Sequence, residues 1–253
     1  MTEQELKDFL ESKTKAYQSE EFIETDPIQV PHEFTNSTDI EISGLISALL
    51  AWGRRDLIIR SSRAILQRMD YAPFDFVMNA SESELSFLRG FRHRTFMGKD
   101  IETLVLALRR MYNDYSSLEE VFLSQDEENL KSGLLRFHHE VMKTNHEKRF
   151  EKHIANPEKG SAAKRLNMFL RWMVRQDSPV DFGIWKQISP AQLSIPLDVH
   201  SGRVARALGL LDRKQNDWKA VERLDISLRK LDPLDPVKYD FALFGLGVFE
   251  SFK

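Results

Sequence analysis

Apolar residues recur along this chain at the spacing of α-helices, and the alternating pattern typical of strands is scarce. Between residues 39 and 52 they cover nearly the whole helical circumference, which is typical of a helix buried inside a bundle. Thr2 with Glu5, and Thr38 with Glu41, have the spacing of a capping box at a helix start. Further helices are expected over residues 56–69, 73–79, 82–89, 127–154, 162–173 and 218–231. The pattern therefore predicts an all-α fold, arranged as a two-lobed helical bundle.

The segment from Pro196 to Leu211 combines a helix signal with candidate chemistry. Pro196 disfavours helix before it, and Asp198 is a residue type preferred at the N-cap of a helix. Val204, Leu208 and Leu211 repeat at i, i+4 and i+7, which marks the buried face. A carboxylate at a helix start is held ionised by the backbone amides and the helix dipole. Capping alone would also explain Asp198, so a further role needs separate evidence.

A second candidate segment is the turn after Pro157, which leads into another helix. Amides at the start of such a helix can bind a phosphate group, and Lys159, Gly160 and Ser161 lie at this turn. One stripe of the helix, at i, i+4, i+7 and i+11, consists of Lys164, Met168, Arg171 and Arg175. The window 143–175 is basic, with nine Lys or Arg residues against three Glu. Either a solvated helix face or a polyanion site would explain this charge.

Composition narrows the function classes. Of 253 residues, 42% are hydrophobic and 30% are charged, which is ordinary for a soluble globular protein. The absence of cysteine excludes disulfides, thiol nucleophiles and an iron–sulfur cluster, and no cofactor is implied. No apolar run approaches the roughly 20 residues of a membrane span, and the acidic N-terminus is unlike a signal peptide. We therefore expect a cytoplasmic protein without a membrane partner. The formal net charge of −3 argues against indiscriminate nucleic-acid binding.

The segment from Pro196 to Leu211 resembles the one that carries the catalytic aspartate in the helix-hairpin-helix DNA glycosylase superfamily. The residues that carry the resemblance are Asp198, His200, Arg203, Val204, Leu208 and Gly209. The resemblance implies the two-lobed helical fold of that superfamily, with Asp198 as the catalytic carboxylate. The chain as a whole also resembles a bacterial family of unknown function, and that second resemblance names no activity.

The turn around Gly160 is similar to the hairpin of the superfamily, although Lys159 stands where an apolar residue is usual. The hairpin and the catalytic segment together would cover about residues 127–215. In bifunctional members of the superfamily, a lysine early in the helix after the hairpin is the nucleophile. Lys164 stands 34 residues before Asp198, which is close to the spacing in the archaeal 8-oxoguanine branch. The resemblance thus implies a nucleophilic Lys164, with phosphate binding as its alternative role.

The resemblance also implies contacts with double-stranded DNA from which one nucleotide is flipped out. The residues expected to contact the nucleic acid are Lys159, Gly160, Ser161, Arg165, Arg171, Arg203, Arg54 and Arg55. The residues expected around the extruded base are Trp52, Met168, Phe169, Trp172 and His200. For Trp52, which ends a buried helix, a place in the core is the alternative.

These features predict a DNA base-excision repair glycosylase, with or without AP-lyase activity, that removes a damaged base such as an oxidised purine. A second hypothesis is a nucleic-acid-binding protein that kept the fold and lost the chemistry. A third is a helical protein that acts on RNA or on a nucleotide. His138, His139 and His146 lack the ligand spacing of a metal site, so no metal is expected.

Overall fold

A computed structural model describes residues 1–123, 128–250 and 252 of the chain. The backbone is mostly helical. The strands formed by the described residues are β1 (Arg92–His93) and β2 (Phe96–Met97), which pair as one short antiparallel hairpin. The predicted all-α class is therefore confirmed. Within the same residues, no helix has both the length and the apolar character needed to cross a bilayer.

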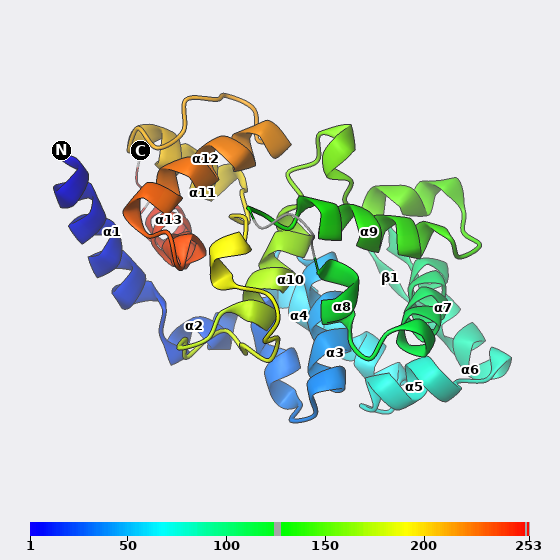
Figure 1. The fold of residues 1–253 in the computed structure, drawn as a ribbon. Helices are drawn as coiled ribbons and strands as arrows, with labels where there is room; N and C mark the ends of the chain where they lie inside the picture. Colours follow the sequence, from blue (N-terminus) through cyan, green and yellow to red (C-terminus); the bar gives the residue numbers. More distant parts are fainter. Residues whose placement is uncertain (124–127, 251, 253) are drawn as a thin grey trace. The chain divides into compact units, whose positions relative to one another are not determined.

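The chain divides into two compact units, and each is described by itself; Figure 1 traces the elements of both along the sequence. Unit 1 comprises residues 1–22, 124–131 and 156–253, and unit 2 comprises residues 23–123 and 132–155. The short helix α2 (Glu20–Thr25) crosses the first boundary along the chain. The boundary at residue 156 falls inside the segment 127–215 that was expected to hold the hairpin and the catalytic residue.

Unit 1 contains α1 (Glu3–Tyr17), α10 (Lys164–Val174), α11 (Val199–Ala207), α12 (Trp218–Leu231) and α13 (Tyr239–Val248). Helix α13 is apolar on almost every side and lies between α1 and α11 (Figure 1). A Cβ atom added at Gly245 would lie 2.2 Å from the ring of Tyr17, and one at Gly247 would lie 3.1 Å from Cβ of His200. The two glycines therefore allow α1 and α11 to approach α13 closely.

Unit 2 contains α3 (Ser37–Leu50), α4 (Arg55–Arg68), α5 (Pro73–Asn79), α6 (Glu82–Phe87), α7 (Gly98–Asp114), α8 (Leu118–Phe122) and most of α9 (Lys131–Met142). Residues 40–50 of α3 are all buried, which confirms the prediction of a helix enclosed by its neighbours. Helices α4 and α5 pack against α3, and α5 also packs against α7. These helices form the core of unit 2 around an apolar α3.

The two predicted capping boxes had different outcomes. Thr2 and Glu5 form the expected reciprocal pair at the start of α1. At α3 the prediction was wrong, because Asn36 caps the helix. Glu41 is instead 3% exposed, and its carboxylate accepts hydrogen bonds from the Tyr112 hydroxyl (2.7 Å) and the Leu118 amide (3.2 Å). A buried carboxylate takes donors from neighbouring elements because leaving it without them would be costly.

The prediction of one long helix over residues 127–154 was also wrong. Residue 127 itself lies outside the residues that the structure describes. Helix α9 ends at Met142, and a 3₁₀ helix follows over Lys148–His153. Tertiary contacts fix this second segment, since the Arg149 guanidinium lies 2.9 Å from the Asp100 carboxylate of α7 and Phe150 is fully buried. Residues 143–149 contain no apolar side chain, and this gap in the periodicity was the available signal for the break.

Candidate functional site

Asp198 begins α11 as its N-cap, as predicted. Its Oδ1 atom accepts hydrogen bonds from the backbone amides of His200 (2.8 Å) and Ser201 (3.0 Å). The Ser201 hydroxyl in turn accepts from the Asp198 amide (3.0 Å), which completes a capping box. Within the described residues, every hydrogen bond to this carboxylate ends on Oδ1. The cap therefore uses one oxygen of the half-buried side chain and leaves Oδ2 for other chemistry.

Asn216 holds the turn before α11 in place from the other side. Its side-chain amide donates to the Asp198 carbonyl oxygen (2.8 Å), and its own oxygen accepts from Arg206 (2.5 Å). A Cβ atom added at Gly202 would lie 2.8 Å from that Asn216 oxygen, so the glycine makes room for this contact. The backbone that carries the Asp198 carboxylate is thus fixed by hydrogen bonds on both faces.

Lys164 is the first residue of α10, and its side chain is half-buried. Ala163 before it adopts the left-handed backbone conformation, with φ of 49°, which costs an alanine about 1 kcal/mol. The Lys164 amine lies 3.4 Å from the Met168 sulfur one turn further along. Among the described residues, no carboxylate forms an ion pair with this amine. Lys164 thus presents a lysine amine without the partner that a structural lysine usually has.

Asp240 of α13 connects these two residues electrostatically. Burial raises the pKa of its carboxyl to about 6; the positive charges of Arg171 and Lys164 oppose this shift, and the negative charge of Asp198 adds to it. Lys164 and Asp198 therefore both lie within electrostatic reach of one buried carboxyl. Sequence reasoning missed Asp240, although a lone acid in an otherwise apolar helix was the available signal.

Arg171 and Arg175 of α10 belong to a buried network of ion pairs. Arg171 pairs with Asp240 and, at 3.1 Å, with Asp181. Arg175 also pairs with Asp181 and, at 2.9 Å, with Asp235. The two arginines are 3% and 2% exposed. The prediction that Arg171 contacts nucleic acid is therefore wrong, because its guanidinium is enclosed and occupied by carboxylates.

The predicted walls of the base pocket are only partly accessible. Phe169 and Trp172 are fully buried in the core of unit 1, so the prediction that they line an open pocket is wrong. Met168 is 6% exposed and touches Lys164 through its sulfur. The half-buried His200 ring packs edge-on against Phe244, at 6.3 Å between ring centres. Met168 and His200 thus remain next to the Lys164 and Asp198 positions respectively.

The turn before α10 does not present free amides to a phosphate group. Gly160 adopts the left-handed conformation, with φ of 84°, and its amide donates to the Pro157 carbonyl (3.0 Å). The amides of Lys159 and Ser161 both donate to Asn156. The amides of Gly160 and Ser161 are therefore not available to a phosphate, whereas binding by the amides at the start of α10 stays a prediction. The Lys159 side chain is exposed and stays a candidate contact.

The remaining arginines predicted to contact nucleic acid differ in burial and in their hydrogen-bond or ion-pair partners. Burial lowers the pKa of the Arg165 guanidinium to about 10. Arg203 is exposed and donates to the Gly247 carbonyl oxygen (2.8 Å). Arg54 and Arg55 lie in unit 2, where Arg54 pairs with Asp56 at 2.7 Å. Trp52 is also in unit 2, and it is half-buried with an arginine stacked on it.

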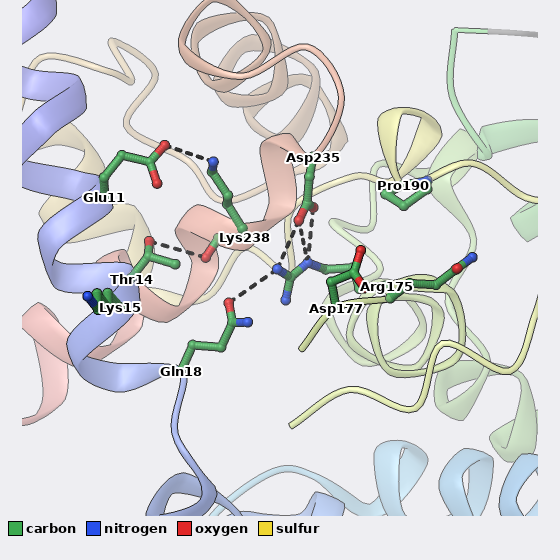
Figure 2. A pocket seen from close by; sticks show the side chains of 10 residues that line it. Glu11, Thr14, Lys15, Gln18, Arg175, Asp177, Pro190, Asp235 and Lys238 are labelled. Atoms are coloured by element: carbon green, nitrogen blue, oxygen red, sulfur yellow. Dashed lines mark hydrogen bonds and ion pairs between the residues drawn. The ribbon is translucent and has the colours of Figure 1, made fainter. Parts of the chain in front are cut away.

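A pocket of about 620 Å³ that sequence reasoning missed lies in unit 1. It is lined by Glu11, Thr14, Lys15, Gln18, Arg175, Gln176, Asp177, Pro190, Asp235 and Lys238. Figure 2 shows Arg175 between Asp235 and Gln18, and Lys238 paired with Glu11 at 2.7 Å. Three acidic and three basic side chains line it, and most of them pair with one another. The pocket is therefore close to neutral and offers no concentrated charge to an ionic ligand.

The fold is that of an all-α protein. Its site combines a half-buried aspartate that caps a helix with a lysine, and the charges of both act on one buried carboxyl. Residues 26–249 match the model of a family described as "Protein of unknown function (DUF2400)", so the chain belongs to that family. No curated protein and no solved structure matches the chain. Among the described residues, no cluster of three or more His, Asp or Glu side chains is arranged to hold a metal ion.

Proposed function

We propose that this protein is a DNA base-excision repair glycosylase, and that Lys164 gives it AP-lyase activity. The observation that carries the proposal is the arrangement around Asp240. One oxygen of the Asp198 carboxylate is unused by its cap, and the charges of Lys164 and Asp198 act on the same buried carboxyl. A nucleophilic amine and a carboxylate are the groups that cleavage of a glycosidic bond by a bifunctional enzyme needs.

The proposed reaction begins with breakage of the bond between the damaged base and C1′ of the deoxyribose. The base leaves with the electron pair of that bond, and positive charge develops on the sugar. The Asp198 carboxylate stabilises this charge through Oδ2, while Oδ1 stays bound to the helix amides. The neutral Lys164 amine then forms a bond to C1′ with its lone pair. The proton that the amine loses passes to the departing base, with Asp198 as the carrier.

The bond from C1′ to the ring oxygen O4′ then breaks, O4′ takes the remaining proton of the lysine nitrogen, and the nitrogen lone pair completes a Schiff base between Lys164 and C1′. Loss of a proton from C2′ allows the bond from C3′ to the 3′ phosphate oxygen to break, so that the phosphate leaves with the electron pair. The strand is cut, and water releases the lysine from the sugar remnant. An oxidised purine such as 8-oxoguanine is the first base to test.

The test compares two aspartates that both cap helices. Asp198 caps α11, and Asp217 caps α12 through hydrogen bonds of the same kind. Asparagine caps a helix about as well as aspartate, so Asp198→Asn and Asp217→Asn should both keep the fold. Base release from a panel of damaged duplexes should fall by roughly 10²–10⁴-fold in Asp198→Asn and stay near the wild-type rate in Asp217→Asn. Equal rates in the two variants would contradict the proposal.

The burial of Phe169 and Trp172 favours a second candidate function. With those walls enclosed in the core, a protein of this family could bind DNA without extruding a base. Such a protein would bind duplex DNA in a salt-dependent manner and release no base from any lesion in the panel. The same duplexes, used first for binding and then for base release, separate the two functions.

A further inference from the structure

The turn of the β1–β2 hairpin in unit 2 lies against the loop that follows α3. The Arg94 guanidinium sits over the Trp52 ring, 4.5 Å from the ring centre. A Cβ atom added at Gly53 would lie 2.1 Å from Nη1 of Arg94, so the glycine makes room for the stacked guanidinium. Next to Arg94, the buried His93 ring lies 2.8 Å from the Ser61 hydroxyl of α4. These contacts hold the hairpin turn, the loop and α4 together.

This place carries exposed positive charge. We use the name "hairpin surface" for five exposed residues, Gly53, Arg54, Arg92, Arg94 and Thr95. Of its three arginines, Arg54 pairs with Asp56, whereas Arg92 and Arg94 have no carboxylate partner among the described residues.

Two exposed arginines elsewhere in unit 2 differ from this pattern. Arg63 lies 2.7 Å from the Glu33 carboxylate, and Arg89 lies 2.8 Å from that of Glu102. Among the described residues, exposed Arg60 of α4 also forms no ion pair, so the hairpin surface is distinguished by having two such guanidinium groups within one short turn.

The backbone at the hairpin turn adds a further observation. Arg94 has φ of 55°, a left-handed conformation that glycine or asparagine adopts more easily than arginine. At an exposed turn, glycine would adopt this conformation at a lower cost. The arginine backbone therefore gives the fold little advantage over a glycine at this position. Its side chain is the part that a glycine would lack, and that side chain is the one stacked on Trp52.

We propose that the hairpin surface contacts the phosphate backbone of DNA. The Trp52 ring and Gly53 hold the guanidinium of the exposed Arg94 in place, and a guanidinium that keeps N–H groups free can bond to a phosphate through two of them. The stacking also reduces the conformational freedom that Arg94 would lose on binding. The choice of DNA as the polyanion rests on the proposed function. The surface itself involves neither Lys164 nor Asp198.

The experiment measures binding to a short undamaged DNA duplex over a range of salt concentrations. The double variant Arg92→Ala/Arg94→Ala is compared with the wild type and with Arg63→Ala/Arg89→Ala, which removes the same charge from exposed arginines of the same unit. In the hairpin variant, the slope of log affinity against log salt should fall by about 2, and the affinity should fall about tenfold or more. The control variant should keep the wild-type slope. Thermal unfolding of each variant checks that the fold is intact.

An unchanged slope in the hairpin variant would overturn the inference, as would binding of the wild type to phosphatidylserine vesicles and not to DNA. A loss in both double variants alike would also overturn it, because total charge would then explain the result. The outcome is separable from that of the proposed function. DNA binding that depends on Arg92 and Arg94 without any base release leaves this inference standing and removes the glycosylase. Base release by a protein whose DNA binding does not depend on these two arginines would remove this inference and leave the glycosylase standing.

Discussion

Two groups of arginines in this protein have opposite surroundings. Arg171 and Arg175 lie inside unit 1, where three aspartates surround them. Arg92 and Arg94 lie on the surface of unit 2, and no described carboxylate pairs with them. Arg171 and Arg175 come from the most basic window of the sequence, yet they add nothing to the basic surface. A basic stretch of sequence therefore forms a binding surface only where the fold does not pair its arginines with carboxylates.

The physical difference lies in desolvation. A buried guanidinium loses its hydration, and ion pairs and hydrogen bonds must replace it, so the partners become part of the fold. An exposed guanidinium keeps its water and can exchange it for a phosphate at little cost. Removal of a buried arginine should therefore change stability, and removal of an exposed one should change binding.

The largest effect expected from this comparison is on the buried side. Arg171→Ala leaves the Asp240 carboxyl without its arginine and Asp181 with only one of its two. We expect the free energy of unfolding to fall by about 3–5 kcal/mol, because an uncompensated charge stays in the core. Denaturant unfolding followed by circular dichroism measures this. A loss below about 1 kcal/mol would show that the network is less enclosed than its exposure indicates.

A second test concerns Asp225, a buried carboxylate that lies farther from its arginine, Arg229, than Asp181 lies from Arg171. Burial raises its pKa to about 6, although the Ile195 amide and Arg229, at 3.7 Å, oppose the shift. A raised pKa in the folded state gives relative stability below about pH 4, and this stability is lost as pH rises through about 6. Against Asp225→Asn, the wild type should lose on the order of 3 kcal/mol between these pH values. Parallel stability curves for the two proteins would contradict this expectation.

A third test changes Gly53, the glycine of the hairpin surface. Gly53 has φ of 106°, and a Cβ atom there would meet the Arg94 guanidinium. Gly53→Ala should cost about 1 kcal/mol of stability from backbone strain, and it should also displace Arg94 from the Trp52 ring. DNA affinity should then fall without a change in the salt slope, because the charge is kept. A reduced slope would mean that the stack is needed for the phosphate contact itself.

The smallest stability effect is expected for Arg94→Ala. Its side chain forms no ion pair with a described residue, so the free energy of unfolding should fall only by about 0.5–1 kcal/mol, the size of an exposed cation–π contact. The same unfolding measurement as for Arg171→Ala gives the comparison directly. A loss equal to that of Arg171→Ala would remove the distinction between the two groups of arginines.

Much of the fold could be predicted because local rules decide it. The helix over 73–79, the buried α3 and the N-cap at Asp198 follow from periodicity, proline placement and capping preference. The break after Met142 was missed although residues 143–149 have no apolar side chain; only the place of the segment that follows depends on distant contacts, those with α7.

The candidate site was predictable only in part, for a similar reason. The Lys164–Arg175 stripe has the spacing of an exposed helix face, but the partners that bury Arg171 lie 10 and 69 residues further along the chain. No pattern within one helix reveals such partners. The contact between Arg94 and Trp52 likewise joins segments that are distant in sequence.

The most direct test of the proposed site is borohydride trapping on a duplex that contains 8-oxoguanine or another damaged base. Borohydride reduces a Schiff base to a stable bond, so a lysine that has attacked C1′ stays attached to the DNA. The account predicts a protein–DNA adduct for the wild type and for Lys219→Ala, which changes an exposed lysine of α12, and none for Lys164→Ala. An adduct of undiminished yield in Lys164→Ala would contradict the assignment of Lys164 as the nucleophile beside Asp198.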